Sequence, residues 1–154
     1  MLFSIFSWAE SIRFVEEKYY EALESTFHKT GTVSFFKDSM LIQYDKDDTL
    51  LTYNGDTLII QKGEEQEVLD LNKSIEVKIF FILFEAVYFE NEKVLARYFE
   101  IEKQKKMIVL KPHRSISSYV EGVSYKKTDS KLDFLQIELR TADRIRIEEL
   151  DEVP

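Results

Sequence analysis

Apolar and polar residues alternate in short runs between residues 31 and 71 of this chain. A period of two is typical of antiparallel strands that bury one face. The dipeptide Asn54-Gly55 lies between two of these runs and is a strong hairpin signal, because both residues accept the positive φ of a type I′ turn. Five strands are expected here, at residues 32–37, 40–44, 50–53, 57–61 and 67–71.

The alternation stops at residues 79–84, which read Ile-Phe-Phe-Ile-Leu-Phe. With Ser74 as a possible N-cap, the pattern predicts a helix that ends at about Phe89 or Asn91. A buried strand over 77–84 is the alternative, but the length of the segment and the glutamates around it favour a helix. Because this helix is apolar on every side, it must be covered or must face something other than water.

Residues 10–27 show a spacing of three and four between apolar positions, which predicts an amphipathic N-terminal helix. The apolar positions are Ile12, Val15, Tyr19, Leu23 and Phe27. After the central helix the pattern returns to strands at 94–102, 107–110, 119–126, 135–139 and 145–147. The expected fold is α+β: a curved antiparallel sheet of nine or ten strands, forming an unclosed half β-barrel covered by the N-terminal helix and the central apolar helix.

Composition narrows the possible functions. The chain has 154 residues, the size of one domain, and 44% hydrophobic residues, enough for a core. Its formal net charge of −8, with dispersed Lys and Arg, disfavours binding to nucleic acid or to an anionic membrane surface. The chain has no cysteine, which excludes a thiolate nucleophile, a disulfide scaffold and a cysteine-ligated metal.

Residues 1–9 are apolar and end in Ser7-x-Ala9, small residues of the kind that signal peptidase accepts. They are either the remnant of a signal peptide, with Glu10 as the mature terminus, or the first turns of the N-terminal helix. Residues 10–154 form the single expected domain. No run approaches the roughly 18 apolar residues of a membrane span.

Catalytic and metal-binding patterns are missing from the sequence. His28 and His113 are far apart and lie in no motif. The acidic run that starts at Asp45 fails as an EF-hand, because Leu50 and Asp56 occupy the positions of the required Gly and Glu. We therefore expect no enzyme, no catalytic residues, no metal and no cofactor.

Bulky apolar residues are the remaining unusual feature of the sequence, and two interpretations stay open. They form an ordinary packed core, or they line a hydrophobic cavity between the sheet and the helices. Composition does not separate the two.

Several segments in this order resemble one family. Gly31-Thr32-x-x-Phe35 begins a strand, Met40 to Tyr44 ends another in an aromatic residue, and Asn54-Gly55 precedes a third. Leu110-Lys-Pro112 ends a later strand, and two amphipathic strands close the chain. Over about residues 10–149 the chain resembles the LolA-like periplasmic outer-membrane lipoprotein carriers, at the level of topology.

The resemblance implies an unclosed barrel with helices as a lid and a cavity that holds the acyl chains of a lipoprotein. It also implies an inner-membrane lipoprotein-releasing transporter and an outer-membrane acceptor as partners. The chain departs from the family at Lys37-Asp38, where the family has an Arg-Pro pair followed by Trp, so no gating arginine is carried over. Without a lipobox cysteine the chain is not itself an acceptor lipoprotein.

We therefore expect a periplasmic, monomeric carrier that binds an acylated lipoprotein or another lipid and shuttles it between the two membranes. The alternative is a non-enzymatic interaction or sensing module on the same half-barrel with a filled core. A small enzyme on the same scaffold would need polar groups that converge in the cavity. The residues expected to line the cavity are Phe35, Met40, Ile42, Tyr44, Tyr53, Phe80, Phe81, Phe84, Val109, Leu135, Ile137, Leu139 and Ile147.

Overall fold

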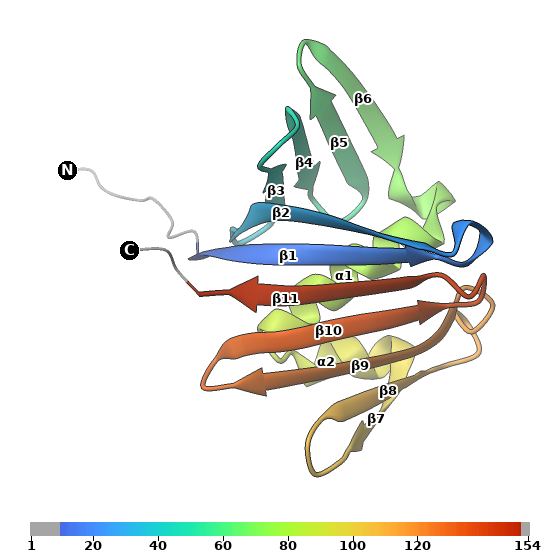
Figure 1. Ribbon diagram of the computed structural model, residues 1–154. Coiled ribbons are helices and arrows are strands. Elements are labelled where there is room, and N and C mark those ends of the chain that lie inside the picture. The colour runs from blue at the N-terminus through green and yellow to red at the C-terminus, as the bar shows by residue number, and fades with distance from the viewer. Residues whose placement is uncertain (1–9, 152–154) are drawn as a thin grey trace.

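Eleven antiparallel strands form one continuous, unclosed sheet in the computed structural model, which describes residues 10–151 (Figure 1). Their order across the sheet is β6-β5-β4-β3-β2-β1-β11-β10-β9-β8-β7. The sheet therefore consists of two meanders that join where β1 pairs with β11. The helical segment leaves one edge of the sheet after β6 and returns at the other edge before β7, so it crosses one face (Figure 1).

The bounds of the elements follow from this arrangement. The first meander comprises β1 (Glu10–Tyr20), β2 (Ser25–Phe35), β3 (Met40–Tyr44), β4 (Thr49–Tyr53), β5 (Thr57–Lys62) and β6 (Glu65–Asp70). The helical segment comprises α1 (Ile75–Tyr88) and α2 (Glu92–Tyr98), and the short 3-10 turns are η1 (Glu21–Leu23) and η2 (Leu71–Lys73). The second meander comprises β7 (Phe99–Lys103), β8 (Ile108–Pro112), β9 (Val120–Thr128), β10 (Lys131–Leu139) and β11 (Arg144–Leu150).

The prediction of an N-terminal helix is wrong. Residues 10–27 belong to the long hairpin of β1 and β2, in which Ile12, Phe14 and Glu16 are buried on one face. Val15 and Tyr19, assigned to the same helical stripe as Ile12, lie on the opposite face of β1 because successive strand residues alternate. The charged residues at inward positions of β1 concealed this period of two. Residues 1–9 lie outside the described part of the chain, so neither interpretation of them is tested.

Most of the other predicted elements are confirmed. The strands predicted at 40–44, 50–53, 57–61 and 67–71 match β3 to β6 within two residues, and the central helix is α1. The strand predicted over 94–102 is wrong in its first part, because α2 occupies that segment up to Tyr98. Asn91 is the N-cap of α2, and its side chain accepts a hydrogen bond from the Val94 N–H at 3.2 Å, which starts the helix.

The hairpin between β4 and β5 is confirmed, but its turn differs from the prediction. Gly55 has a φ of 100°, whereas Asn54 is not among the residues with positive φ. The Asn54 N–H donates to the Thr57 carbonyl at 3.2 Å, so Gly55 and Asp56 are the central residues of the turn. Asn54 contributes through its side chain, which accepts a hydrogen bond from the Thr57 hydroxyl at 2.7 Å.

Aromatic side chains hold α1 against the sheet. Phe84 makes edge-to-face contacts with Phe14 on β1 and Phe35 on β2, each at a centroid distance of 5.9 Å. Phe81 stacks on Tyr53 of β4 at 4.9 Å. Each such contact adds about 0.5–1.5 kcal/mol to the effect of burial. The sheet thus covers one side of the apolar helix α1. The position of α1 determines where empty space remains between the helix and the sheet.

Candidate functional site: an apolar pocket beneath α1

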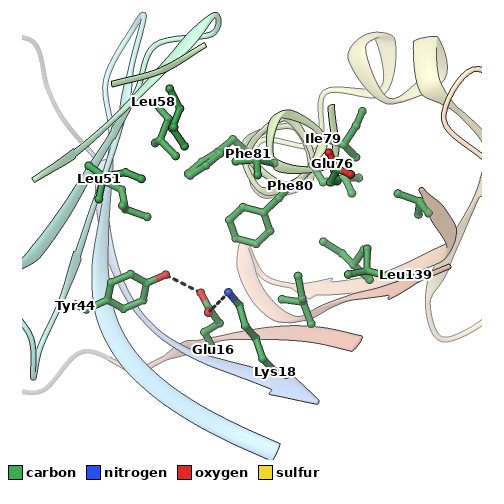
Figure 2. A pocket seen from close by; sticks show the side chains of 17 residues that line it. Glu16, Lys18, Tyr44, Leu51, Leu58, Glu76, Ile79, Phe80, Phe81 and Leu139 are labelled. Carbon is green, nitrogen blue, oxygen red and sulfur yellow. Dashed lines mark hydrogen bonds and ion pairs between the residues drawn. The ribbon is translucent and has the colours of Figure 1, made fainter. Parts of the chain in front are cut away.

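A pocket of about 360 Å³ lies between α1 and the sheet (Figure 2) and is partly open to solvent. One wall comes from the first meander: Leu51, Leu58, Ile60 and Leu69. The other wall comes from the second meander: Val120, Ile137, Leu139 and Ile145. Helix α1 contributes Glu76, Val77, Ile79, Phe80, Phe81 and Leu83. Glu16, Lys18 and Tyr44, on β1 and β3, complete the lining.

Cross-strand pairing places the apolar walls. Leu51 on β4 pairs with Ile60 on β5, so both side chains project from the same face of the sheet. Ile137 on β10 pairs with Ile145 on β11 in the same way. The inward face therefore continues across both meanders as an aliphatic surface. Where α1 does not reach that surface, the pocket remains.

Phe80 projects from α1 into the middle of the pocket, between the two walls (Figure 2). It is only partly buried, in contrast to its neighbour Phe81. Its ring contacts Phe81 at 5.1 Å and Phe84 at 6.0 Å, both edge to face. A side chain in this position limits the length of any apolar chain that enters the space.

A polar group interrupts the apolar lining at the sheet side of the pocket (Figure 2). The Glu16 carboxylate is 3% exposed, and its Oε1 accepts a hydrogen bond from the Tyr44 hydroxyl at 2.8 Å. Its Oε2 lies 3.4 Å from the Lys18 Nζ, and the Lys18 side chain is 40% exposed. Burial, and then the Glu16 charge, raises the pKa of Tyr44, which keeps this hydroxyl protonated as a donor.

The residues predicted to line a cavity divide into three groups. Tyr44, Phe80, Phe81, Ile137 and Leu139 line the pocket. Others are buried in the core and do not line it: Phe35, Met40, Ile42, Tyr53, Phe84, Leu135 and Ile147. Val109 lies on β8 between Ile108 and Leu110, which pack in the core, so its side chain points to the other face.

Several lining residues were missed by sequence reasoning. Leu51, Leu58 and Ile60 lie in strands that were predicted, and a correct assignment of their inward face would have identified them. Glu16 and Lys18 are charged residues within the segment predicted as a helix, so no signal in the sequence marks them as pocket residues.

Glu76 on α1 also lines the pocket, and both histidines lie outside it. His28 pairs with Glu17 at 3.1 Å, and the His113 ring lies 3.0 Å from the Ala96 carbonyl oxygen. Within residues 10–151, no group of three or more potential metal ligands comes together. The helices of that same part of the chain are too short or too polar to span a bilayer. The pocket is therefore lined mainly by apolar side chains, and its charged groups are the Glu16–Lys18 ion pair and the Glu76 carboxylate.

Comparison of the chain with protein-family models and with curated protein sequences finds no match.

Proposed function

We propose that this protein is a periplasmic carrier that binds the acyl chains of a lipoprotein, or of another amphiphile, in the pocket beneath α1. The observation that carries the proposal is the pocket itself, which is lined by aliphatic and aromatic side chains from both meanders and from α1. Its volume of about 360 Å³ lies at the lower end of the range of about 300–1,000 Å³ for ligand pockets. Each acyl CH₂ that leaves water for such a surface contributes about 0.8 kcal/mol.

The open sheet supports the same proposal. An unclosed sheet with a helix across one face leaves room between them that a closed, filled barrel would not. Binding of this kind requires no catalytic group, since desolvation of the chain supplies the driving force. In the cell, such a carrier would take its cargo from an inner-membrane lipoprotein-releasing transporter and deliver it to an outer-membrane acceptor.

The alternative is an interaction or sensing module with a filled core on the same half-barrel. Core residues such as Phe84 and Met40 are tightly buried, as that alternative requires. The empty volume between Phe80, Leu139 and Leu51 favours the carrier, because a module with a filled interior has no use for it.

Solubilisation of a lipopeptide tests the carrier proposal. The purified chain is incubated with liposomes that contain a dipalmitoylated lipopeptide, the liposomes are sedimented, and lipopeptide in the supernatant is measured. We expect soluble lipopeptide in proportion to protein. Phe80→Asp on α1 and Ile60→Asp on the first meander should each abolish solubilisation, because they place a carboxylate where the chain would lie.

A matched control is Val68→Asp. Val68 is 58% exposed on β6 and does not line the pocket, so this variant should solubilise lipopeptide like the unmodified protein. Circular dichroism shows which variants are folded. A folded protein that leaves all lipopeptide in the sediment would refute the carrier proposal, and so would equal activity in all three variants.

A further inference from the structure

We propose that Lys18 binds the oxygen-bearing head of the amphiphile and that the tail lies beneath α1, so that the pocket prefers acyl chains with an anionic head over cationic ones. This inference rests on the proposed function and specifies its ligand. The head meant here is an oxygen that accepts hydrogen bonds, bound most tightly when it is a carboxylate.

Lys18 is the only basic residue among the described residues that line the pocket, and the acidic residues there are Glu16 and Glu76. Its ammonium carries three N–H donors, and Glu16, 3.4 Å away, cannot engage all of them. The remaining donors are available to an acceptor at the pocket margin. A hydrogen bond between two charged groups is about twice as strong as a neutral one, so a carboxylate gains most.

Glu16 and Lys18 differ in burial, and this difference determines which of the two a ligand contacts first. The Glu16 side chain is 3% exposed, whereas the Lys18 side chain is 40% exposed. The Tyr44 hydroxyl already donates to Glu16 from the other side. A head that approaches from solvent therefore meets the ammonium first, and a cationic head is repelled there before it reaches the carboxylate.

Glu16 also holds the lysine in place. A lysine side chain has many rotamers, and ordering one of them at the moment of binding costs entropy. The ion pair with Glu16 restricts that freedom before the ligand arrives. Glu16 therefore has two opposed effects on an anionic head: it orients Lys18, and its own charge weakens the attraction.

The test compares three amphiphiles with the same chain and different heads: laurate, dodecanol and dodecyltrimethylammonium. Each displaces the neutral fluorescent probe N-phenyl-1-naphthylamine from the full chain. We expect laurate to bind about tenfold more tightly than dodecyltrimethylammonium, with dodecanol between them. Added salt should weaken the binding of laurate and leave the binding of dodecanol unchanged, because screening acts only on the charged head.

Variants of Glu16 and Lys18 distinguish binding of the head from binding of the tail. Lys18→Met should weaken the binding of laurate about tenfold and that of dodecanol much less, because a neutral hydroxyl accepts a weaker hydrogen bond from the ammonium than a carboxylate does. Because that variant leaves a buried carboxylate with one partner fewer, the double variant with Glu16→Gln and Lys18→Met provides the same test without an unpaired charge. Glu16→Gln alone should strengthen the binding of laurate a few-fold. The glutamine amide oxygen still accepts the hydrogen bond from the Tyr44 hydroxyl, and the charge that repels the carboxylate is gone.

Lys29→Met is the matched control. Lys29 lies opposite Glu16 in the β1–β2 register, but its Nζ lies over the Tyr44 ring and it does not line the pocket. This variant should bind laurate like the unmodified protein. Equal affinities for laurate and dodecyltrimethylammonium, or an equal loss of laurate and dodecanol in the Lys18 variants, would overturn the role of Lys18 while tail binding stands. Displacement of the probe by none of the three would refute the proposed function itself.

Discussion

The Tyr44 hydroxyl on β3 donates a 2.8 Å hydrogen bond to the buried carboxylate of Glu16 on β1, across the intervening strand β2. Glu16 is the only buried charged residue between residues 10 and 151. A buried carboxylate is tolerated only when it is paired and hydrogen-bonded. This bond therefore links β3 to β1, at the centre of the sheet, and compensates the charge at the pocket margin.

Tyr44→Phe is expected to destabilise the protein by about 2 kcal/mol, because it leaves a buried charged acceptor without its donor. The phenyl ring keeps its edge-to-face contact with Phe14, which lies 6.1 Å away. Urea unfolding measures the change. Tyr19→Phe is the control, because Tyr19 donates to an exposed partner, Glu21, and its loss should cost less than about 0.5 kcal/mol. Equal losses would show that Glu16 does not depend on Tyr44.

A methyl group at residue 31 has no room in this fold. A Cβ at Gly31 would lie 2.6 Å from the Gln43 carbonyl oxygen and 3.2 Å from Cζ of Phe14. Gly31→Ala should therefore destabilise the protein by about 1–3 kcal/mol through overpacking. Gly122→Ala on β9 is the control, because a Cβ there meets nothing within 4 Å. Thermal unfolding compares the two, and a similar midpoint for both variants would contradict the expected clash.

Asp45 should make the stability of the folded protein depend on pH under acidic conditions. The Arg13 guanidinium donates to both Asp45 carboxylate oxygens at 2.7 Å, and the Thr30 hydroxyl donates to Oδ2 at 2.6 Å. These bonds hold the pKa of Asp45 well below its ordinary value of 3.8. A depressed folded pKa stabilises the protein above the unfolded pKa, and this contribution is lost as the pH falls below about 4.

Asp45→Asn should therefore lower stability at neutral pH and flatten its decline between about pH 4 and pH 2. Urea midpoints at several pH values measure this. Asp48→Asn changes an exposed aspartate in the same turn region and should leave the slope as it is in the unmodified protein. The same steep acid decline in Asp45→Asn would show that Asp45 is not the group responsible.

Phe80 should set the length of chain that the pocket accepts. Phe80→Ala removes the side chain that projects into the middle of the pocket (Figure 2), so palmitate should gain affinity relative to laurate. Probe displacement with both ligands measures the ratio. Phe36→Ala removes a phenyl ring that is 37% exposed and does not line this pocket, and should leave the ratio unchanged. An unchanged ratio in Phe80→Ala would contradict the role of Phe80.

The sequence alone determined the helices and strands that are specified by residue patterns within a short stretch of the chain. The strands from Met40 to Asp70 follow from alternation and turn residues within a few positions of one another, and α1 follows from the length of its segment and the glutamates around it. These elements need no distant partner to be recognised. The turn at Gly55 was located for the same reason, although its central pair was shifted by one residue.

Only the tertiary structure determined that β1 is a strand rather than a helix, and where the pocket lies. Charged residues at the inward positions Glu16 and Lys18 contradict a buried strand locally, and they are tolerated because Tyr44, distant in sequence, supplies the missing partner. Likewise, the sequence lists the apolar side chains but does not say which of them α1 covers. Phe84 packs onto Phe14 and Phe35 and closes that part of the interior, whereas within residues 10–151 Phe80 makes its aromatic contacts only with Phe81 and Phe84 of α1 and leaves space beside it. Packing between distant segments, rather than local pattern, therefore separates core from pocket.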